Sequence, residues 1–124
     1  MIEVLGATKE NRPLVYLAAP YSDPDPAVRN RRFLEATRAT AKLITKQECV
    51  YSPITYTHAI CQVVSLDPLD EGWYALDERF LRRCSKLIVL QLPGWEKSNG
   101  VTAEIEIARE MGIPVEFLEA DYAD

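Results

Sequence analysis

The clearest pattern in the chain lies between residues 86 and 112, where a short apolar run is followed by helical spacing. Residues 87–90 (LIVL) are apolar without interruption, which is typical of a strand buried on both faces of a sheet. After a loop that contains Pro93 and Gly94, apolar residues recur with the period of a helix, which is expected to end at Gly112. The segment therefore predicts a strand, a loop and a helix in succession.

The same patterns predict that strands and helices alternate along the rest of the chain. Strands are expected over residues 14–19, 49–52 and 113–118, and helices over residues 27–46 and within 69–84. Residues 54–65 fit either a loop or a short helix. Residues 1–12 show no clear period, and we expect them to form an extension ahead of the core.

Strands that alternate with helices imply a parallel sheet with right-handed crossovers. The predicted fold is therefore α/β: a three-layer α/β/α arrangement around a Rossmann-like or flavodoxin-like parallel sheet of four to five strands, with residues 1–124 in a single domain. In such sheets, ligands bind beyond the carboxyl ends of the strands, where the strand order switches. The loops after Ala19, Ser52 and Leu92 are expected to meet at that edge.

Glu104 falls on the apolar face of its predicted helix. On a helical wheel it lies between Ala108 and Met111, whereas Glu106 and Glu110 lie on the opposite side. A carboxylate on an inward face loses hydration unless it is hydrogen-bonded or lines a cavity. A position at the edge of the helix, or an ion pair with an arginine, would also explain this placement.

Asp77 is a second carboxylate on an apolar helical face. Within residues 69–84, Trp73 and Phe80 belong to this face, and Asp77 lies near its centre. Two inward carboxylates on neighbouring elements are hard to explain separately. Together with Glu104, Asp77 predicts one polar pocket.

The loops at the carboxyl edge of the sheet carry polar and aromatic residues suited to contact a ligand. They are Tyr21, Ser22, Ser52, Trp95, Ser98, Asn99 and Gly100. Residues 98–100 open the helix of Glu104, where free amide donors and the helix dipole favour an anion, although such residues are also typical of an ordinary N-cap. Arg29 and Arg32, at the start of the helix over residues 27–46, fit either a solvated face or a contact to such an anion.

Composition and charge narrow the class of protein. The 124 residues are 48% hydrophobic and 27% charged, as in ordinary globular proteins, and no apolar run approaches bilayer length, so we expect a cytoplasmic protein with no membrane partner. The net charge of −5 argues against a nucleic-acid polymer as partner, because binding many phosphates needs a basic surface. Cys49, Cys61 and Cys84 are expected to be reduced thiols, and with His58 as the only histidine we expect no metal and no cofactor.

Several of these residues, in this order along the chain, resemble a known family, the nucleoside 2-deoxyribosyltransferase superfamily, including its 2'-deoxynucleoside 5'-phosphate N-hydrolase branch. The resemblance covers residues 14–115 and is closest to a bacterial and phage subgroup catalogued as a domain of unknown function. The matching segments are YLAAP from Tyr16, SPI from Ser52, Trp73 with Asp77, and SxGVxxE from Ser98 to Glu104.

The resemblance implies a role for each matched position. Glu104 takes the place of the nucleophile that attacks C1' of the deoxyribose, and Asp77 that of the acidic residue that protonates the departing base or holds the sugar. Tyr16 matches a tyrosine beside the nucleophile, and Ser98 with Gly100 matches the turn that binds the 5' end. Ser22, Ser52, Trp73 and Asn99 are then expected to contact the substrate. The resemblance also implies a homodimer or a higher homo-oligomer.

The expected reaction is cleavage of the N-glycosidic bond of a 2'-deoxynucleoside or its 5'-monophosphate. Residues 20–22 differ from the small and basic residues of the hydrolase branch, so both substrates remain open. A carboxylate beneath the anomeric carbon stabilises an oxocarbenium-like transition state and can capture it as a glycosyl ester on Glu104. Attack by water would make the enzyme a hydrolase, and attack by a second base a transferase. The alternative is a nucleotide-binding or sensing module of the same fold without catalysis.

Overall fold

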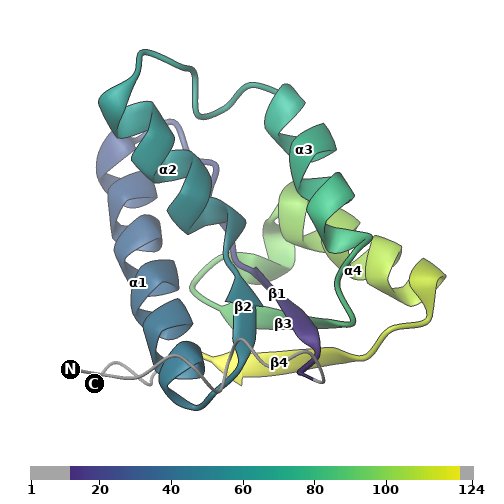
Figure 1. Ribbon diagram of the computed structural model, residues 1–124. Coiled ribbons are helices and arrows are strands. Elements are labelled where there is room, and N and C mark those ends of the chain that lie inside the picture. Colours follow the sequence, from purple (N-terminus) through teal and green to yellow (C-terminus); the bar gives the residue numbers. More distant parts are fainter. Residues whose placement is uncertain (1–11, 121–124) are drawn as a thin grey trace.

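The computed structural model describes residues 12–120 as strands and helices in alternation (Figure 1). The elements are β1 (Leu14–Ala18), α1 (Pro26–Thr45), β2 (Cys49–Tyr51), α2 (Pro53–Val63), α3 (Gly72–Leu81), β3 (Lys86–Gln91), the short 3-10 helix η2 (Trp95–Lys97), α4 (Asn99–Met111) and β4 (Val115–Glu119). The extension expected at residues 1–12 lies, except for Arg12, outside the described residues.

The strands form one four-stranded sheet in the order β2-β1-β3-β4, and every neighbouring pair is parallel. In the centre of the sheet, Tyr16 pairs with Leu87 and Ala18 with Val89. The predicted α/β class and the predicted parallel sheet are therefore confirmed.

Alternate residues of the central strands build two separate cores, one on each face of the sheet. On one face, Val15 and Leu17 of β1 pack with Ala36 and Ala39 of α1. On the other face, Tyr16 and Ala18 of β1, with Leu87 and Val89 of β3, pack with residues of α3 and α4, among them Leu81, Val101 and Ala108. Because side chains alternate along a strand, β1 supplies both cores, and the result is the predicted three-layer arrangement (Figure 1).

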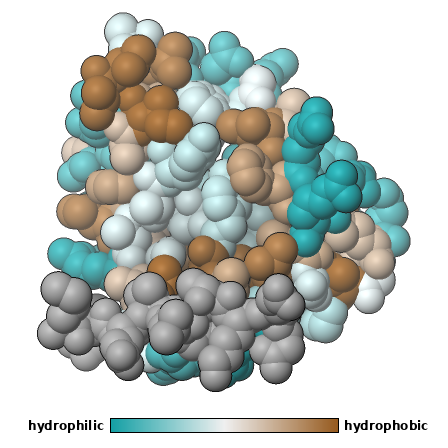
Figure 2. Space-filling view, viewed as in Figure 1, coloured by the Kyte–Doolittle hydropathy of each residue, from teal (hydrophilic) through white to brown (hydrophobic). Residues whose placement is uncertain are grey.

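Helix capping at Ser52 explains the structure of residues 54–65, for which the sequence fitted either a loop or a short helix. The side chain of Ser52 accepts a hydrogen bond from the backbone N–H of Thr55, and Pro53 occupies the first turn, so α2 begins directly after β2. Residues 54–65 therefore contain a helix, which ends at Val63. The strongly hydrophobic surface in Figure 2 includes the end of this helix, where Val63 and Val64 are exposed. None of the helices within residues 12–120 is long and apolar enough to cross a membrane.

The helix expected within residues 69–84 is shorter than the apolar pattern suggests. It spans Gly72–Leu81, and the face expected to be buried is only partly covered, because Phe80 is 39% exposed while Leu81 is fully buried. Asp77 lies in its last two turns.

The strand order switches between β1 and β3. The chain leaves β1 toward α1 on one face of the sheet and leaves β3 toward α4 on the opposite face. The loops that follow these two neighbouring strands therefore diverge and leave a crevice at the carboxyl edge of the sheet.

Candidate functional site

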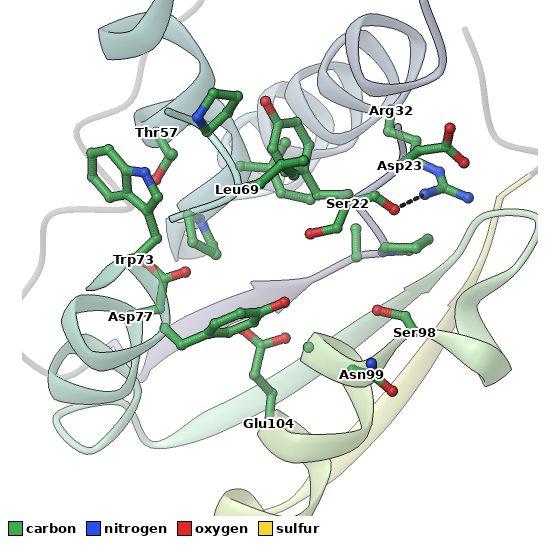
Figure 3. Close-up of a pocket in the computed structure, with 18 of the residues that line it drawn as sticks. Ser22, Asp23, Arg32, Thr57, Leu69, Trp73, Asp77, Ser98, Asn99 and Glu104 are labelled. Atoms are coloured by element: carbon green, nitrogen blue, oxygen red, sulfur yellow. Dashed lines mark hydrogen bonds between the residues drawn. The ribbon is translucent and has the colours of Figure 1, made fainter. Parts of the chain in front are cut away.

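A pocket of about 400 Å³ occupies this crevice (Figure 3). Its walls come from the loop after β1, the first turns of α2, the loop before α3 with α3 itself, and the loop between β3 and α4. The pocket therefore lies at the switch point, where the sequence predicted a ligand site.

Glu104 lines this pocket from α4, about one turn inside the helix. The hydroxyl of Tyr16, a fully buried residue of β1, donates a hydrogen bond to Glu104 Oε2. Tyr16 is one of the β1 residues whose side chains face α4, so the strand alternation itself brings the phenol beneath the carboxyl group. Burial raises the pKa of Tyr16 well above its ordinary value, with help from the nearby Glu104 and Asp77, so the phenol stays protonated and acts as a donor.

The pKa of Glu104 is raised from 4.5 to about 8, and the main cause is removal of the carboxyl from water. The hydrogen bond from Tyr16 opposes this rise, because a donor stabilises the charged form, and the charge of Asp77 adds to it. An arginine partner, one of the explanations left open by the sequence, is not among these causes. The carboxyl of Glu104 instead faces the pocket.

Asp77 lines the same pocket from α3 and has no compensating partner. Its Oδ1 atom is buried and lacks a hydrogen-bond partner among the described residues, and burial raises the pKa of Asp77 from 3.8 to about 7. Figure 3 shows the side chains of Asp77 and Glu104 on the same side of the pocket. The structure therefore places in one pocket the two inward carboxylates that the sequence patterns singled out, with Tyr16 beneath Glu104.

The two carboxyl groups titrate as a pair rather than singly, because each charge disfavours the other. With pKa values of about 7 and about 8, the pair carries close to a single proton between these two pH values. Taken alone, these values put the shared proton on Glu104, which has the higher pKa. The hydrogen bond from Tyr16 acts in the other direction, toward a negative charge on Glu104 and the proton on Asp77. Such a pair can supply one nucleophile and one acid.

The other end of the pocket is formed by the start of α4. The side chain of Ser98 caps this helix by accepting a hydrogen bond from the N–H of Val101 at 3.2 Å, and Ser98, Asn99 and Gly100 all line the pocket. Gly100 packs closely against Tyr74: a Cβ atom there would lie 3.3 Å from the ring of Tyr74, so the ring would have to shift by a few tenths of an ångström. This end of the pocket combines the helix dipole with polar side chains, and both favour an anion.

Arg32 adds a positive charge at this end and joins the two loops of the crevice. Its guanidinium donates to the carbonyl oxygen of Ser22 at 3.1 Å, drawn as a dashed line in Figure 3, and to that of Pro93 at 3.4 Å. Gly94 has a positive φ of 91°, and a Cβ atom there would lie 3.2 Å from the guanidinium, so the loop passes close to Arg32. Lys97 lines the pocket as well.

The remaining predicted substrate contacts divide into those at the pocket and those away from it. Trp73 and Ser22 line the pocket, and the indole N–H of Trp73 donates to the carbonyl of Asp67 at 2.9 Å, which fixes the ring. Ser52 does not line the pocket: it is buried, and its hydroxyl serves the start of α2. Trp95 packs against Phe117, with ring centroids 5.5 Å apart.

Among the pocket residues that sequence reasoning missed are Thr57, Tyr74 and Lys97. Thr57 lies in the segment left open between loop and helix, and it enters the pocket because α2 turns the face of Ile54 toward the crevice. Tyr74 follows Trp73 directly and covers Gly100. Lys97 lies in the loop between β3 and α4, where no sequence pattern distinguished it from a solvent-exposed lysine. A helix assigned to residues 53–63, with its Ser-Pro start, would have pointed to Thr57.

Within residues 12–120, no cluster of histidine, cysteine or acidic residues has the arrangement needed to hold a metal ion. His58 is buried, and its ring contacts Phe33, Tyr21 and Gln62. The cysteines of the chain are free thiols, as expected.

A search of curated proteins finds no match to this chain. A family model does match it, over residues 13–120, which span every strand and helix described above. The chain therefore belongs to the family described as Domain of unknown function (DUF1937).

Proposed function

We propose that this protein cleaves the N-glycosidic bond of a 2'-deoxynucleoside or of its 5'-monophosphate. The observation that carries the proposal is the pair of carboxyl groups in one pocket, with Glu104 held by Tyr16 and Asp77 without a partner. Breaking this bond needs a negative charge beneath the sugar and a proton for the departing base. The pair can supply both.

In the first step, a carboxylate oxygen of Glu104 forms a bond to C1' while the bond from C1' to the base nitrogen breaks. The electron pair of the broken bond leaves with the base, which takes the proton of the Asp77 carboxyl. The products are a free base and a glycosyl ester on Glu104, with Asp77 now ionised. Tyr16 stabilises the charge of Glu104 before the attack and the ester oxygen after it.

In the second step, water or a second base attacks C1' and releases Glu104 as a carboxylate. The ionised Asp77 accepts the proton of the attacking group, which restores the starting state. Water gives hydrolysis and a second base gives transfer.

The opposite end of the pocket supports a phosphorylated substrate. Arg32 and Lys97 line it beside the start of α4, although the chain as a whole has a net charge of −5. The carboxylate of Asp23 lies beside Arg32 and offsets part of the charge of the two cations. The start of α4 adds to the remaining positive charge and favours a local anion, and a 5'-phosphate would place the sugar between that end and Glu104. We therefore rank the 5'-monophosphate above the nucleoside.

A second candidate function is binding without turnover. It is favoured by the raised pKa of Glu104, since a carboxyl with a pKa of about 8 is mostly protonated at pH 7 in the ligand-free site. A protonated Glu104 is a poor nucleophile and a good hydrogen-bond donor to a ligand. This candidate predicts tight binding of a nucleotide with no release of base.

The deciding experiment is a screen for base release. The purified protein is incubated with the common 2'-deoxynucleosides and their 5'-monophosphates, and free base is measured by chromatography. We expect release from at least one monophosphate, and loss of release in Glu104→Gln. Binding of these compounds without any release would support the second candidate instead.

The proposal includes a cytoplasmic location, where such nucleotides are made and used, and a homo-oligomer as the active form. Light scattering on the purified protein measures the mass in solution. A monomer that is fully active would remove the oligomer from the proposal.

A further inference from the structure

Thr57 is a buried residue of the pocket whose hydroxyl has no partner. It is 5% exposed, it lines the pocket from α2, and its Oγ1 atom makes no hydrogen bond within the described residues. Thr55, two positions earlier, shows the contrast: its hydroxyl pairs with Thr37 at 2.8 Å and with Ser52 at 3.0 Å. A buried polar group without a partner costs free energy unless a ligand or water satisfies it.

A second such atom faces the same space. Asp77 Oδ1 is also buried and unpartnered, and it lines the pocket from α3. Figure 3 shows Thr57, Trp73 and Asp77 on one side of the pocket and Ser98 and Asn99 on the other. The two unpartnered atoms therefore lie at the end of the pocket away from the start of α4.

The surface around these atoms is apolar. Trp73 lines this end together with Ile54, which lies one turn before Thr57 on α2, and the indole N–H of Trp73 is already bonded to the backbone of Asp67. The ring of Trp73 can thus offer only its faces and edges to a ligand. A flat heteroaromatic group with polar atoms along one edge fits such an apolar space with two isolated hydrogen-bonding positions.

We propose that Thr57 determines the base specificity of the reaction: its hydroxyl binds a second polar atom of the leaving base, next to the atom that Asp77 protonates. This inference rests on the proposed function and deepens it. Purines with an oxo or amino group at position 6 present two polar atoms side by side, N7 and the 6-substituent. A threonine hydroxyl both donates and accepts, so it serves either substituent. The substrate class is therefore the 6-substituted purine 2'-deoxynucleotides.

The test compares three variants on matched substrates. Thr57→Val removes the hydroxyl and keeps the shape of the side chain, whereas Thr57→Ser keeps the hydroxyl. Thr40→Val is the control, because the hydroxyl of Thr40 donates to the carbonyl of Ala36 in its own helix, at 2.7 Å, and Thr40 does not line the pocket. The substrates are dAMP, dGMP and the 5'-monophosphate of purine 2'-deoxyriboside, which lacks the 6-substituent.

We expect the wild-type protein, Thr57→Ser and Thr40→Val to prefer the 6-substituted purines by about 3- to 10-fold in kcat/KM, the effect of one neutral hydrogen bond. Thr57→Val should lose this preference and should melt no lower than the wild type, because the substitution removes an unpartnered buried hydroxyl. The same preference is measured as a ratio of Kd values in the Glu104→Gln background, where no turnover interferes.

The outcomes separate this inference from the proposed function. Cleavage with a preference that Thr57→Val leaves intact, or a preference for pyrimidines, overturns the role of Thr57 and leaves the reaction standing. Binding that depends on Thr57 without any cleavage overturns the reaction and leaves the role of Thr57 as a base contact. A wild-type protein that neither binds nor cleaves these nucleotides overturns both.

Discussion

Tyr16 and Glu104 lie 88 positions apart in the chain, and a hydrogen bond from the phenol to the carboxyl joins the central strand β1 to α4. Tyr16 is fully buried and Glu104 is half-buried at the wall of the pocket, and burial raises the pKa of both. The bond is nevertheless the one contact that lowers the pKa of Glu104. The hydrogen bond therefore favours the ionised form of Glu104, whereas burial favours the protonated form.

We expect Tyr16→Phe to raise the pKa of Glu104 further. The acid limb of the kcat/KM profile should move to higher pH, and activity near pH 7 should fall by roughly 10-fold or more, the effect of losing a hydrogen bond to a charged group. The measurement is base release from pH 5 to 10. Tyr56→Phe, in the same aromatic cluster but 45% exposed, is the control and should keep the wild-type profile. An unchanged acid limb in Tyr16→Phe would remove Tyr16 from the mechanism.

A contrast within α4 tests the nucleophile. Glu104→Gln keeps the size of the side chain and removes its charge, so turnover should fall by orders of magnitude while the free energy of unfolding at pH 8 rises, since a desolvated carboxyl is lost. Glu106→Gln changes the same residue type on the exposed face and should alter neither. Chromatography of the free base and thermal melting measure both properties. Equal damage by the two substitutions would show that Glu104 has no special role.

The raised pKa values also predict how stability depends on pH. Burial raises the pKa of Glu104 from 4.5 to about 8 and that of Asp77 from 3.8 to about 7, so between these values the folded protein binds more protons than the unfolded chain. The stability that this contributes is fully present below about pH 4 and is lost as the pH rises through 7 to about 8. His58 acts in the opposite direction, because burial lowers its pKa.

The check for this dependence is therefore a difference between proteins. The free energy of unfolding is measured in urea from pH 5 to 9 for the wild type and for the double variant Asp77→Asn with Glu104→Gln. The free energy of unfolding of the double variant should increase relative to that of the wild type as the pH rises. His58 contributes equally to both proteins and therefore cancels in the difference. A constant difference across this range would mean that neither carboxyl has a raised pKa.

The layers of the fold could be predicted from the sequence because their signals are local. An unbroken apolar run such as residues 87–90 marks a strand buried on both faces without any knowledge of its neighbours. Glu104 and Asp77 were found for a related reason: a carboxylate on an apolar helical face is an anomaly visible within one helix. Both inferences need only the period of a single element.

The residues that escaped prediction depend on which elements meet in space. Thr57 is an unremarkable threonine until α2 is placed beside the crevice. For Arg32 the sequence left open a solvated face or a contact to an anion, and its hydrogen bonds to both loops depend on the loops after β1 and β3 lying close together. Ser52 shows the reverse case. Ser52 follows a strand at the edge of the sheet where ligands bind, but its hydroxyl caps α2 and does not contact the pocket. Short polar side chains that follow a strand often cap the next helix instead of binding a ligand.

Two substrates can distinguish whether Asp77 donates a proton or only shapes the pocket. Asp77→Asn removes the proton for the departing base, so turnover of ordinary nucleotides should fall by about 10²- to 10⁴-fold, the usual contribution of a general acid. A substrate that releases 4-nitrophenolate in place of the base needs no proton in the first step, so Asp77→Asn should release the first equivalent of 4-nitrophenolate at near the wild-type rate, although breakdown of the glycosyl ester stays slow. Glu78→Gln is the neighbouring control on α3, where it breaks only an exposed ion pair with Arg82 of 2.9 Å, and it should slow neither substrate. If Asp77→Asn slows the first release from both substrates equally, Asp77 shapes the pocket rather than donating a proton, and the acid must be sought elsewhere.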